Sequence, residues 1–387
     1  MFASLALVVL AGLLGPVLAA GRKPLAPVLV GELIAGAVLG KTWLHLVVPT
    51  TQPFPAFSAL GFAMLMLEAG RQVDLGSKEL RDGAVRGGLA LLVVLALSVP
   101  VGLVMGAVFP TGRSLLLVVL LAGSSAAVAF PAIRERRLTG PAVAIVITWI
   151  TLADALTAVL MPLTLSAAGR IPLALAGDGL IIVAAALTII VARRLFQIGL
   201  ADEIERQSKE RHWALQLRLS VLLLLVLSAI AERTGASLLV AGFAAGIVLR
   251  RFDQPHRFVQ QLAGLASGFF VPAFFVLLGA SLDLSSLVRS PSAIGLALAM
   301  AIGATAVHVV ASLVTGKEQR LPAGLLASAQ LGLPAAAAAL GLATGVLRPP
   351  IAAAIVAGGL LTLIPAIAGA ILLGGGGPEK RDSGLPV

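Results

Sequence analysis

The chain has 387 residues, of which 59% are hydrophobic and 12% are charged, about half the charged share of an ordinary soluble domain. Its mean hydropathy of +1.04 places it in a lipid bilayer. The net charge of +10 does not indicate nucleic-acid binding, because the basic residues stand in short segments between apolar runs. The chain has no cysteine and only four scattered histidines, so disulfides are excluded and no cofactor or structural metal is expected.

The apolar runs predict an all-α membrane protein with about thirteen transmembrane helices, counted as stretches able to cross ~30 Å of hydrocarbon. No basic residue precedes the first run, so we interpret it as a retained helix rather than a cleaved signal peptide. The expected helices lie near 2–20, 25–40, 55–70, 84–109, 113–133, 141–166, 172–195, 213–232, 236–249, 262–281, 292–315, 321–343 and 350–374.

Basic residues are distributed unevenly between alternate loops. With the N-terminus outside, 22 of the 28 lysines and arginines fall on the cytoplasmic side and 6 on the other. Cytoplasmic loops are generally the basic ones, so we expect a multi-pass protein of the bacterial inner membrane with its C-terminus in the cytoplasm. The polar segment 197–212 is expected to be a solvated cytoplasmic link, and the short tail after 374 indicates no attached nucleotide-binding domain.

The two halves of the chain share an internal repeat with an offset of about 210 residues. Six identical residues align 29–39 with 239–249 without a gap, and a Gly-x-x-x-Asp-Leu pattern follows at Gly70 and at Gly279. Seven expected helices separate equivalent positions, so the halves must cross the membrane in opposite directions, as in many secondary transporters. We therefore expect two inverted six-helix repeats joined by a linker helix, and alternating access.

Asp154 lies near the middle of the sixth expected helix. An acid at that depth costs on the order of 3 kcal/mol, so intramembrane acids usually serve transport. Thr151 and Thr157 share roughly the same helix face and offer hydroxyl oxygens. This arrangement predicts a site at which a monovalent cation and a proton compete for one carboxylate. The alternative is an aspartate that only bonds neighbouring helices.

Two other helices are expected to be interrupted at the same depth. The fifth contains Ala122-Gly123-Ser124-Ser125, and the twelfth contains the segment 330–334, which begins with Gln330. Unwound backbone inside a membrane exposes carbonyls and helix ends that bind ions. Ser124 and Ser125 are therefore candidate cation ligands, and Gln330 is a secondary one. Small residues that only permit close helix packing are the alternative.

Two further ionisable residues lie within apolar runs. His308, in the eleventh helix, has an ordinary pKa of ~6.5 and is a candidate pH sensor or charge partner, or else a neutral histidine bonded to a neighbouring helix. Glu32, in the second helix, is a secondary candidate for ion binding. Asp283 is expected to be a helix cap or an interface charge, and Gly36 and Gly246 are expected to be packing contacts.

The sequence resembles the cation:proton antiporter superfamily, in particular the NapA-like and KefC-like membrane domains. The resemblance covers nearly the whole chain. It rests on the run Leu25-Ala26-Pro27-Val28-Leu29-Val30-Gly31-Glu32-Leu33-Ile34-Ala35-Gly36, on Phe274-Phe275-Val276-Leu277-Leu278-Gly279 through Asp283-Leu284, and on the region around Asp154.

This resemblance implies a homodimer whose fifth and twelfth helices are broken and cross beside Asp154. Helices 1–3 (1–83) and 8–10 (213–285) would form the dimerisation and gate part, and helices 4–6 (84–168) and 11–13 (286–374) a moving core. The linker helix and cytoplasmic loop would occupy 169–212, and the tail 375–387. The transported species would be a monovalent cation and a proton, with no nucleic acid involved.

The chain departs from the family pattern at two positions. Ala153 stands where electrogenic members carry a second acid and other branches carry Asn or Gln, and His308 stands at or beside the position of a Lys or Arg. Because both halves of that ion pair are missing together, we expect electroneutral exchange of one proton for one cation. A KefC-like potassium efflux pathway and a proton-coupled carrier of another solute remain open. An intramembrane enzyme is disfavoured, because the sequence has no Gly-x-Ser-x-Gly and no His-x-x-x-His motif.

Overall fold

The computed structural model describes residues 2–19, 28–72, 78–109, 111–165, 171–198, 206–208, 211, 213–252, 256–316 and 319–375. These residues form helices and connecting segments, with no strand among them. The helices are α1 (Phe2–Gly12), α2 (Leu14–Ala19), α3 (Val28–Leu39), α4 (Phe54–Gln72), α5 (Lys78–Val108), α6 (Ser114–Ala122), α7 (Ala126–Glu135), α8 (Pro141–Leu165), α9 (Ile171–Gln197), α11 (Leu215–Thr234), α12 (Leu238–Arg250), α13 (His256–Leu265), a π-helical turn (Ala266–Phe270), α14 (Val271–Ser281), α15 (Leu284–Val288), α16 (Pro291–Ala311), α17 (Arg320–Ala327), α18 (Gly332–Ala343), α19 (Pro349–Leu361) and α20 (Leu363–Gly375).

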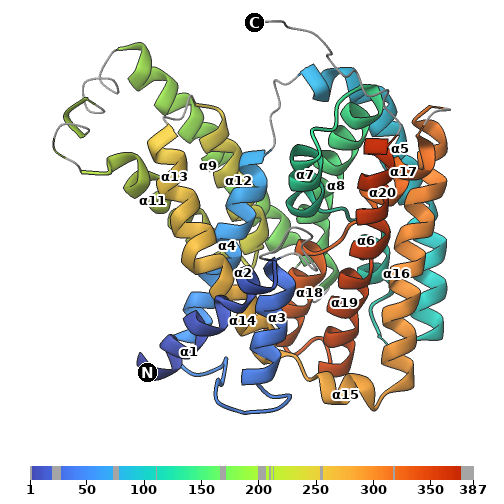
Figure 1. Cartoon of the computed structure of the whole chain (residues 1–387). Helices are drawn as coiled ribbons and strands as arrows, with labels where there is room; N and C mark the ends of the chain where they lie inside the picture. Colours follow the sequence, from blue (N-terminus) through green and yellow to red (C-terminus); the bar gives the residue numbers. More distant parts are fainter. Residues whose placement is uncertain are drawn as a thin grey trace, which may run out of the picture.

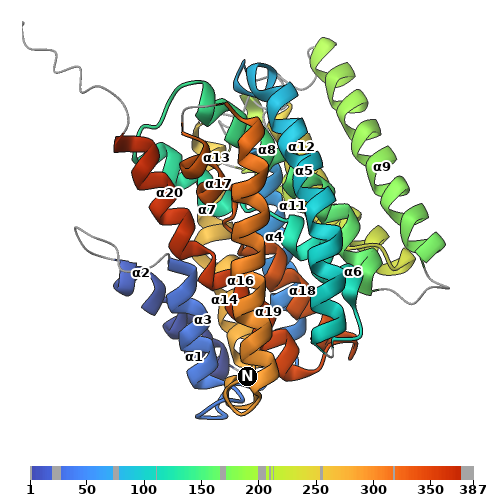
Figure 2. The same cartoon turned by 90° about the vertical axis from the view of Figure 1, so that its right-hand side faces the viewer.

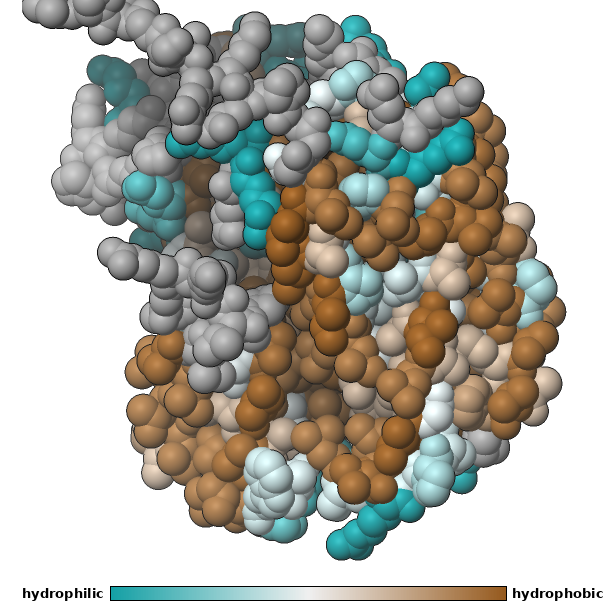
Figure 3. All heavy atoms as spheres, turned by 45° about the vertical axis from the view of Figure 1, so that its right-hand side comes forward, coloured by the Kyte–Doolittle hydropathy of each residue, from teal (hydrophilic) through white to brown (hydrophobic). Residues whose placement is uncertain are grey.

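Each expected transmembrane segment contains helix in the described residues. Eight helical stretches are long and apolar enough to cross a membrane, and α1–α2, α3 and α12 are shorter apolar helices. The surface carries a broad apolar band, with hydrophilic side chains gathered towards its two ends (Figure 3). The all-α membrane class is thus confirmed, whereas the count of thirteen crossings stays a prediction. The tenth segment begins earlier than expected, at His256, and α15 is an additional short helix. Most of the polar link 197–212 and all of the tail after 375 lie outside the described residues.

The helices pack mainly within two groups, which stand side by side in Figure 1. The first group contains α1–α4 and α11–α14, and α9 packs along α11 and α12 at its edge (Figure 2). The second group contains α5–α8 and α16–α20. The groups meet where α8 contacts α12, where α14 contacts α18 and where α4 contacts α7. Their assignment to a dimerisation part and a moving core stays a prediction.

Within the first group, four glycines let helices approach to backbone contact. A Cβ atom at any of them would overlap a carbonyl oxygen of the facing helix. The glycine–carbonyl pairs are Gly36 with Val276, Gly246 with Leu67, Gly70 with Phe243, and Gly279 with Leu33. Gly36 and Gly246 are separated by about 210 residues, the offset of the internal repeat, and so are Gly70 and Gly279. The residues that they face are separated by the same offset. Gly36 and Gly246 are thus packing contacts as expected, and the doubled arrangement supports the predicted repeat.

A single methyl group at Gly36 should therefore separate α3 from α14. We expect Gly36→Ala to lower the melting temperature of the purified protein or to prevent recovery of monodisperse protein, because overpacking typically costs about 1–3 kcal/mol. Gly88→Ala is the matched control, since no atom lies within 4 Å of a Cβ placed there. Size-exclusion chromatography and thermal melts in detergent measure the effect. Equal melting temperatures for the two variants would contradict the close approach.

Candidate functional site

Two helices of the second group are interrupted where they meet. The first interruption separates α6, which ends at Ala122, from α7, which begins at Ala126. The second separates α17, which ends at Ala327, from α18, which begins at Gly332. A Cβ on Gly123 would strike the side chain of Leu333, so the two interruptions are in direct contact. Both predicted breaks are confirmed, although the second starts two residues before the expected Gln330.

Asp154 lies on the continuous helix α8 and reaches the first interruption. Its Oδ2 atom accepts a hydrogen bond of 2.9 Å from the backbone N–H of Ala126. Ala126 is the first residue of α7, whose free N–H groups carry the positive end of the helix dipole. The carboxylate is half-buried and lines a pocket between the two helix groups. One carboxylate oxygen is therefore bonded to the backbone of α7, and the side chain also lines the pocket.

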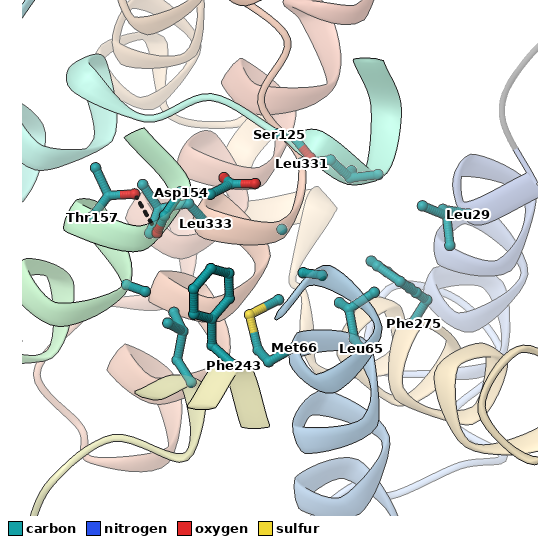
Figure 4. Close-up of a pocket in the computed structure, with 14 residues that line it drawn as sticks. Leu29, Leu65, Met66, Ser125, Asp154, Thr157, Phe243, Phe275, Leu331 and Leu333 are labelled. Carbon is teal, nitrogen blue, oxygen red and sulfur yellow. Dashed lines mark hydrogen bonds between the residues drawn. The ribbon is translucent and has the colours of Figure 1, made fainter. Parts of the chain in front are cut away.

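The pocket has three polar side chains among mostly apolar ones (Figure 4). Asp154 and Thr157 come from α8, and Ser125 comes from the interruption. The Thr157 hydroxyl donates to the Ala153 carbonyl at 2.7 Å, which leaves its oxygen lone pairs available. The remaining lining residues are small or apolar: Leu29, Leu65, Met66, Ala69, Ala158, Leu239, Phe243, Phe275, Leu331, Gly332 and Leu333. Among the sequence-predicted ligands, the structure thus brings Asp154, Ser125 and Thr157 together.

Ser124 faces away from this pocket. Its hydroxyl donates to the Ala327 carbonyl at 2.8 Å and lies 3.2 Å from Nε2 of His308. Nδ1 of His308 lies 2.8 Å from the Ala304 carbonyl, and the imidazole stacks on the ring of Trp149 with centroids 5.3 Å apart. Ser124 and His308 are both fully buried. Ser124 therefore joins the first interruption to the end of α17 and to His308 of α16, and neither side chain lines the pocket.

Gln330 also acts between the interruptions. Its Nε2 atom donates to the carbonyl oxygens of Leu120 at 2.7 Å and Gly123 at 3.0 Å, at the C-terminal end of α6. Carbonyls at a helix end have no partner within the helix, so the amide satisfies groups that the break exposes. The backbone N–H of Gln330 donates to Oγ1 of Thr362 at 2.9 Å. Like Ser124, Gln330 lies beside the pocket and does not line it.

Two predicted residues lie apart from these contacts. Thr151 is buried in α8 but is absent from the pocket lining. Glu32 is 1% exposed, and its Oε2 atom has no hydrogen-bond partner among the described residues. One turn before it, Leu29 lines the pocket. Asp283 caps α15 as expected, with Oδ1 accepting from the Ser286 N–H at 2.9 Å.

Thr362 and Asp178 are among the buried polar residues that the sequence analysis did not select. Thr362, at the junction of α19 and α20, carries a hydroxyl that hydropathy does not distinguish from its surroundings. Asp178 of α9 is 3% exposed, and neither carboxylate oxygen has a hydrogen-bond partner in the described part of the chain. As a lone acid in the apolar run 171–192, Asp178 could have been found by the reasoning that selected Asp154.

A second, larger cavity lies between the same helix groups. Its lining includes Met161, two turns beyond Asp154 on α8, and the charged side chains of Lys41 and Arg348. Phe62 and Phe274 also line it, and their ring centroids are 5.4 Å apart. The two cavities share no lining residue. No cluster of three or more metal-binding side chains occurs in the described ranges.

Comparisons with known proteins agree with this arrangement. The chain is 26% identical over 310 residues to the putative Na(+)/H(+) antiporter YjbQ of Bacillus subtilis, covering 74% of this chain and 48% of that protein. It is 31% identical over 142 residues to the high-affinity Na(+)/H(+) antiporter NhaS3 of Synechocystis sp., covering 34% and 30%. The match thus spans about half the length of YjbQ and less than a third of the length of NhaS3.

A solved structure has a similar fold. The sodium proton antiporter MjNhaP1 of Methanocaldococcus jannaschii matches 97% of this chain and 96% of its own, with a TM-score of 0.62 and 15% sequence identity. The family of transmembrane sodium/hydrogen exchangers matches residues 5–373. The chain is therefore a multi-pass membrane protein that belongs to the sodium/hydrogen exchanger family.

Proposed function

We propose that the protein exchanges a monovalent cation, Na+ or K+, for a proton by alternating access, with Asp154 as the site that both ions share. The observation that carries this proposal is the place of the carboxylate. It lies at the start of α7, lines a pocket between two helix groups, and forms no ion pair with a cationic side chain among the described residues. Family membership and the antiporter names of the relatives support cation–proton exchange.

The pocket supplies the oxygen ligands that a hard cation needs. Asp154 provides the charge, and Ser125 and Thr157, which carry hydroxyl oxygens, line the same pocket. Carboxylate and hydroxyl oxygens together suit an alkali cation that keeps part of its water shell. We therefore assign the cation to Asp154, Ser125 and Thr157. Ser124, Thr151 and Gln330 would act from outside the first coordination sphere.

Coupling follows from the charge of the site. With a proton or a cation bound, Asp154 is neutral as a unit and can move through a region of low dielectric constant. The empty carboxylate is charged, and carrying it across the barrier is unfavourable. Exchange of the two ions is thus favoured over net movement of either. A single acid, with Ala153 before it, gives one proton per cation and electroneutral transport.

The two cavities suggest how access alternates. The site pocket and the larger cavity lie between the same helix groups but are lined by different residues. Sliding of the second group, which carries Asp154, against the first would transfer the carboxylate from one cavity to the other. The homodimer, the lipid contacts and the orientation with the N-terminus outside belong to the same proposal. His308 could serve in it as a pH sensor or a substitute charge partner.

Replacing the carboxylate tests the site directly. We expect Asp154→Asn to reduce cation-dependent proton flux in proteoliposomes to the level of protein-free vesicles, because the amide is neutral and cannot exchange a proton. Asp283→Asn is the control, since asparagine also caps helices and Asp283 is not among the pocket residues. A pH-sensitive dye with imposed Na+ and K+ gradients gives the flux. Full flux in Asp154→Asn would contradict the assignment.

Electroneutrality can be tested with the same vesicles. We expect the initial exchange rate to be unchanged when a membrane potential of either sign is imposed, because one positive charge moves each way per cycle. Rates that change with potential would indicate an unequal stoichiometry. Cation flux that needs no proton counter-gradient would instead favour a KefC-like efflux pathway, and proton flux driven by another solute would favour a proton-coupled carrier.

The two adjacent serines should have separate effects. Ser125→Ala removes a pocket oxygen, so we expect the apparent KM for the cation to rise about three- to tenfold with little change in melting temperature. Ser124→Ala leaves the buried Ala327 carbonyl without its donor, so we expect a loss of about 1–3 kcal/mol of stability. Kinetics and thermal melts on both variants check this. The reverse pattern would return Ser124 to the cation site.

A further inference from the structure

The second interruption is held by a contact that mirrors the contact of Asp154. Helices α8 and α19 both begin with a proline, Pro141 and Pro349. Thirteen residues beyond each proline stand Asp154 and Thr362, so the two side chains occupy equivalent positions in the predicted repeat. Each accepts a 2.9 Å hydrogen bond from a backbone N–H at an interrupted helix. Asp154 bonds the N–H of Ala126, and Thr362 bonds that of Gln330.

The two caps differ in charge. A carboxylate can bind a proton or a cation, whereas a hydroxyl stays neutral and only exchanges hydrogen bonds. The Thr362 hydroxyl uses its own proton for the Gly359 carbonyl at 2.6 Å. Both Thr362 and Gln330 are buried, and neither is among the residues that line the pocket. The acceptor at the first interruption, Asp154, can therefore exchange ions, whereas the acceptor at the second, Thr362, stays neutral.

Gln330 connects Thr362 to the proposed ion site. Its backbone is held by Thr362, and its side chain donates two hydrogen bonds to the Leu120 and Gly123 carbonyls. Gly123 is two residues before Ser125, which lines the pocket. A movement of Gln330 would thus shift the chain that carries Ser125 and the Ala126 N–H. The path from Thr362 to Ser125 consists of two hydrogen bonds, from the Gln330 N–H to Thr362 and from the Gln330 side chain to Gly123, and two residues of backbone.

We infer that Thr362 is a positioning residue for cation binding, the uncharged counterpart of Asp154 in the second half. It fixes Gln330, and Gln330 fixes the wall of the pocket that contains Ser125. This inference rests on the proposed function. It predicts that the Thr362 hydroxyl affects affinity for the cation although it never touches the ion.

Three threonine variants in proteoliposomes test the inference. Thr362→Val removes the hydroxyl and keeps the branched shape, and we expect it to raise the apparent KM for the cation about fivefold while the maximal rate changes less. Thr362→Ser keeps the hydroxyl and should stay within about twofold of the wild type. Thr188→Val is the matched control, because the Thr188 hydroxyl donates to the Ala184 carbonyl of its own helix α9 at 2.8 Å.

Gln330→Met provides a second measurement that does not depend on the folding of Thr362→Val. It keeps the backbone N–H that donates to Thr362 and the length of the side chain, and it removes both amide donors without adding a charge or another donor, so it should also raise the KM. The inference is overturned if Thr362→Val or Gln330→Met has the KM of the wild type, or if Thr362→Ser is as impaired as Thr362→Val. Failure of the proposed function is a separate result, in which the wild type itself shows no cation-dependent proton flux.

Discussion

The structure depends on how the backbone groups freed by two broken helices are satisfied inside a membrane. A lipid-facing N–H or C=O without a partner costs several kcal/mol, so each break needs side chains that replace the lost helix bonds. Carbonyls at the end of α6 receive the Gln330 amide, and the Ala327 carbonyl receives the Ser124 hydroxyl. The N–H of Ala126 is bonded to Asp154. The proposed ion exchange at Asp154 therefore takes place at a break contact whose acceptor can change its charge.

This arrangement also explains why a carboxylate can be retained in the membrane. The start of α7 provides a partial positive charge and a hydrogen-bond donor, and the pocket provides space for a cation or water at the opposite edge. A carboxylate enclosed only by Leu and Phe side chains would have neither. Several pocket residues are apolar, including Met66, Phe243 and Leu333, so a bound ion would have few competing ligands. The charge of Asp154 is thus tolerated because it is only partly enclosed.

The sequence predicted the fold class and both helix breaks, and it singled out Asp154, which the structure places beside the first break. Each of these features produces a strong local signal. Long apolar runs require helices, Gly-Ser-Ser weakens a helix, and an acid in an apolar run is costly. The direction of Ser124 could not be predicted, because an interrupted segment has no helical period to assign side chains to a face. Thr362 was missed because a hydroxyl in a membrane helix can bond its own backbone and gives no hydropathy signal. Its importance became visible only through its contact with Gln330.

The replacement of a long basic side chain by His308 fits the geometry around the breaks. The imidazole lies between the Ala304 carbonyl and the Ser124 hydroxyl and is stacked on Trp149, so a compact ring fills a site enclosed on several sides. A Lys or Arg there would bring a permanent charge, and without an acid at position 153 that charge would have no adjacent partner. Under the proposed function, the absence of both the second acid and the long basic side chain leaves Asp154 as the charge that the transported ion balances.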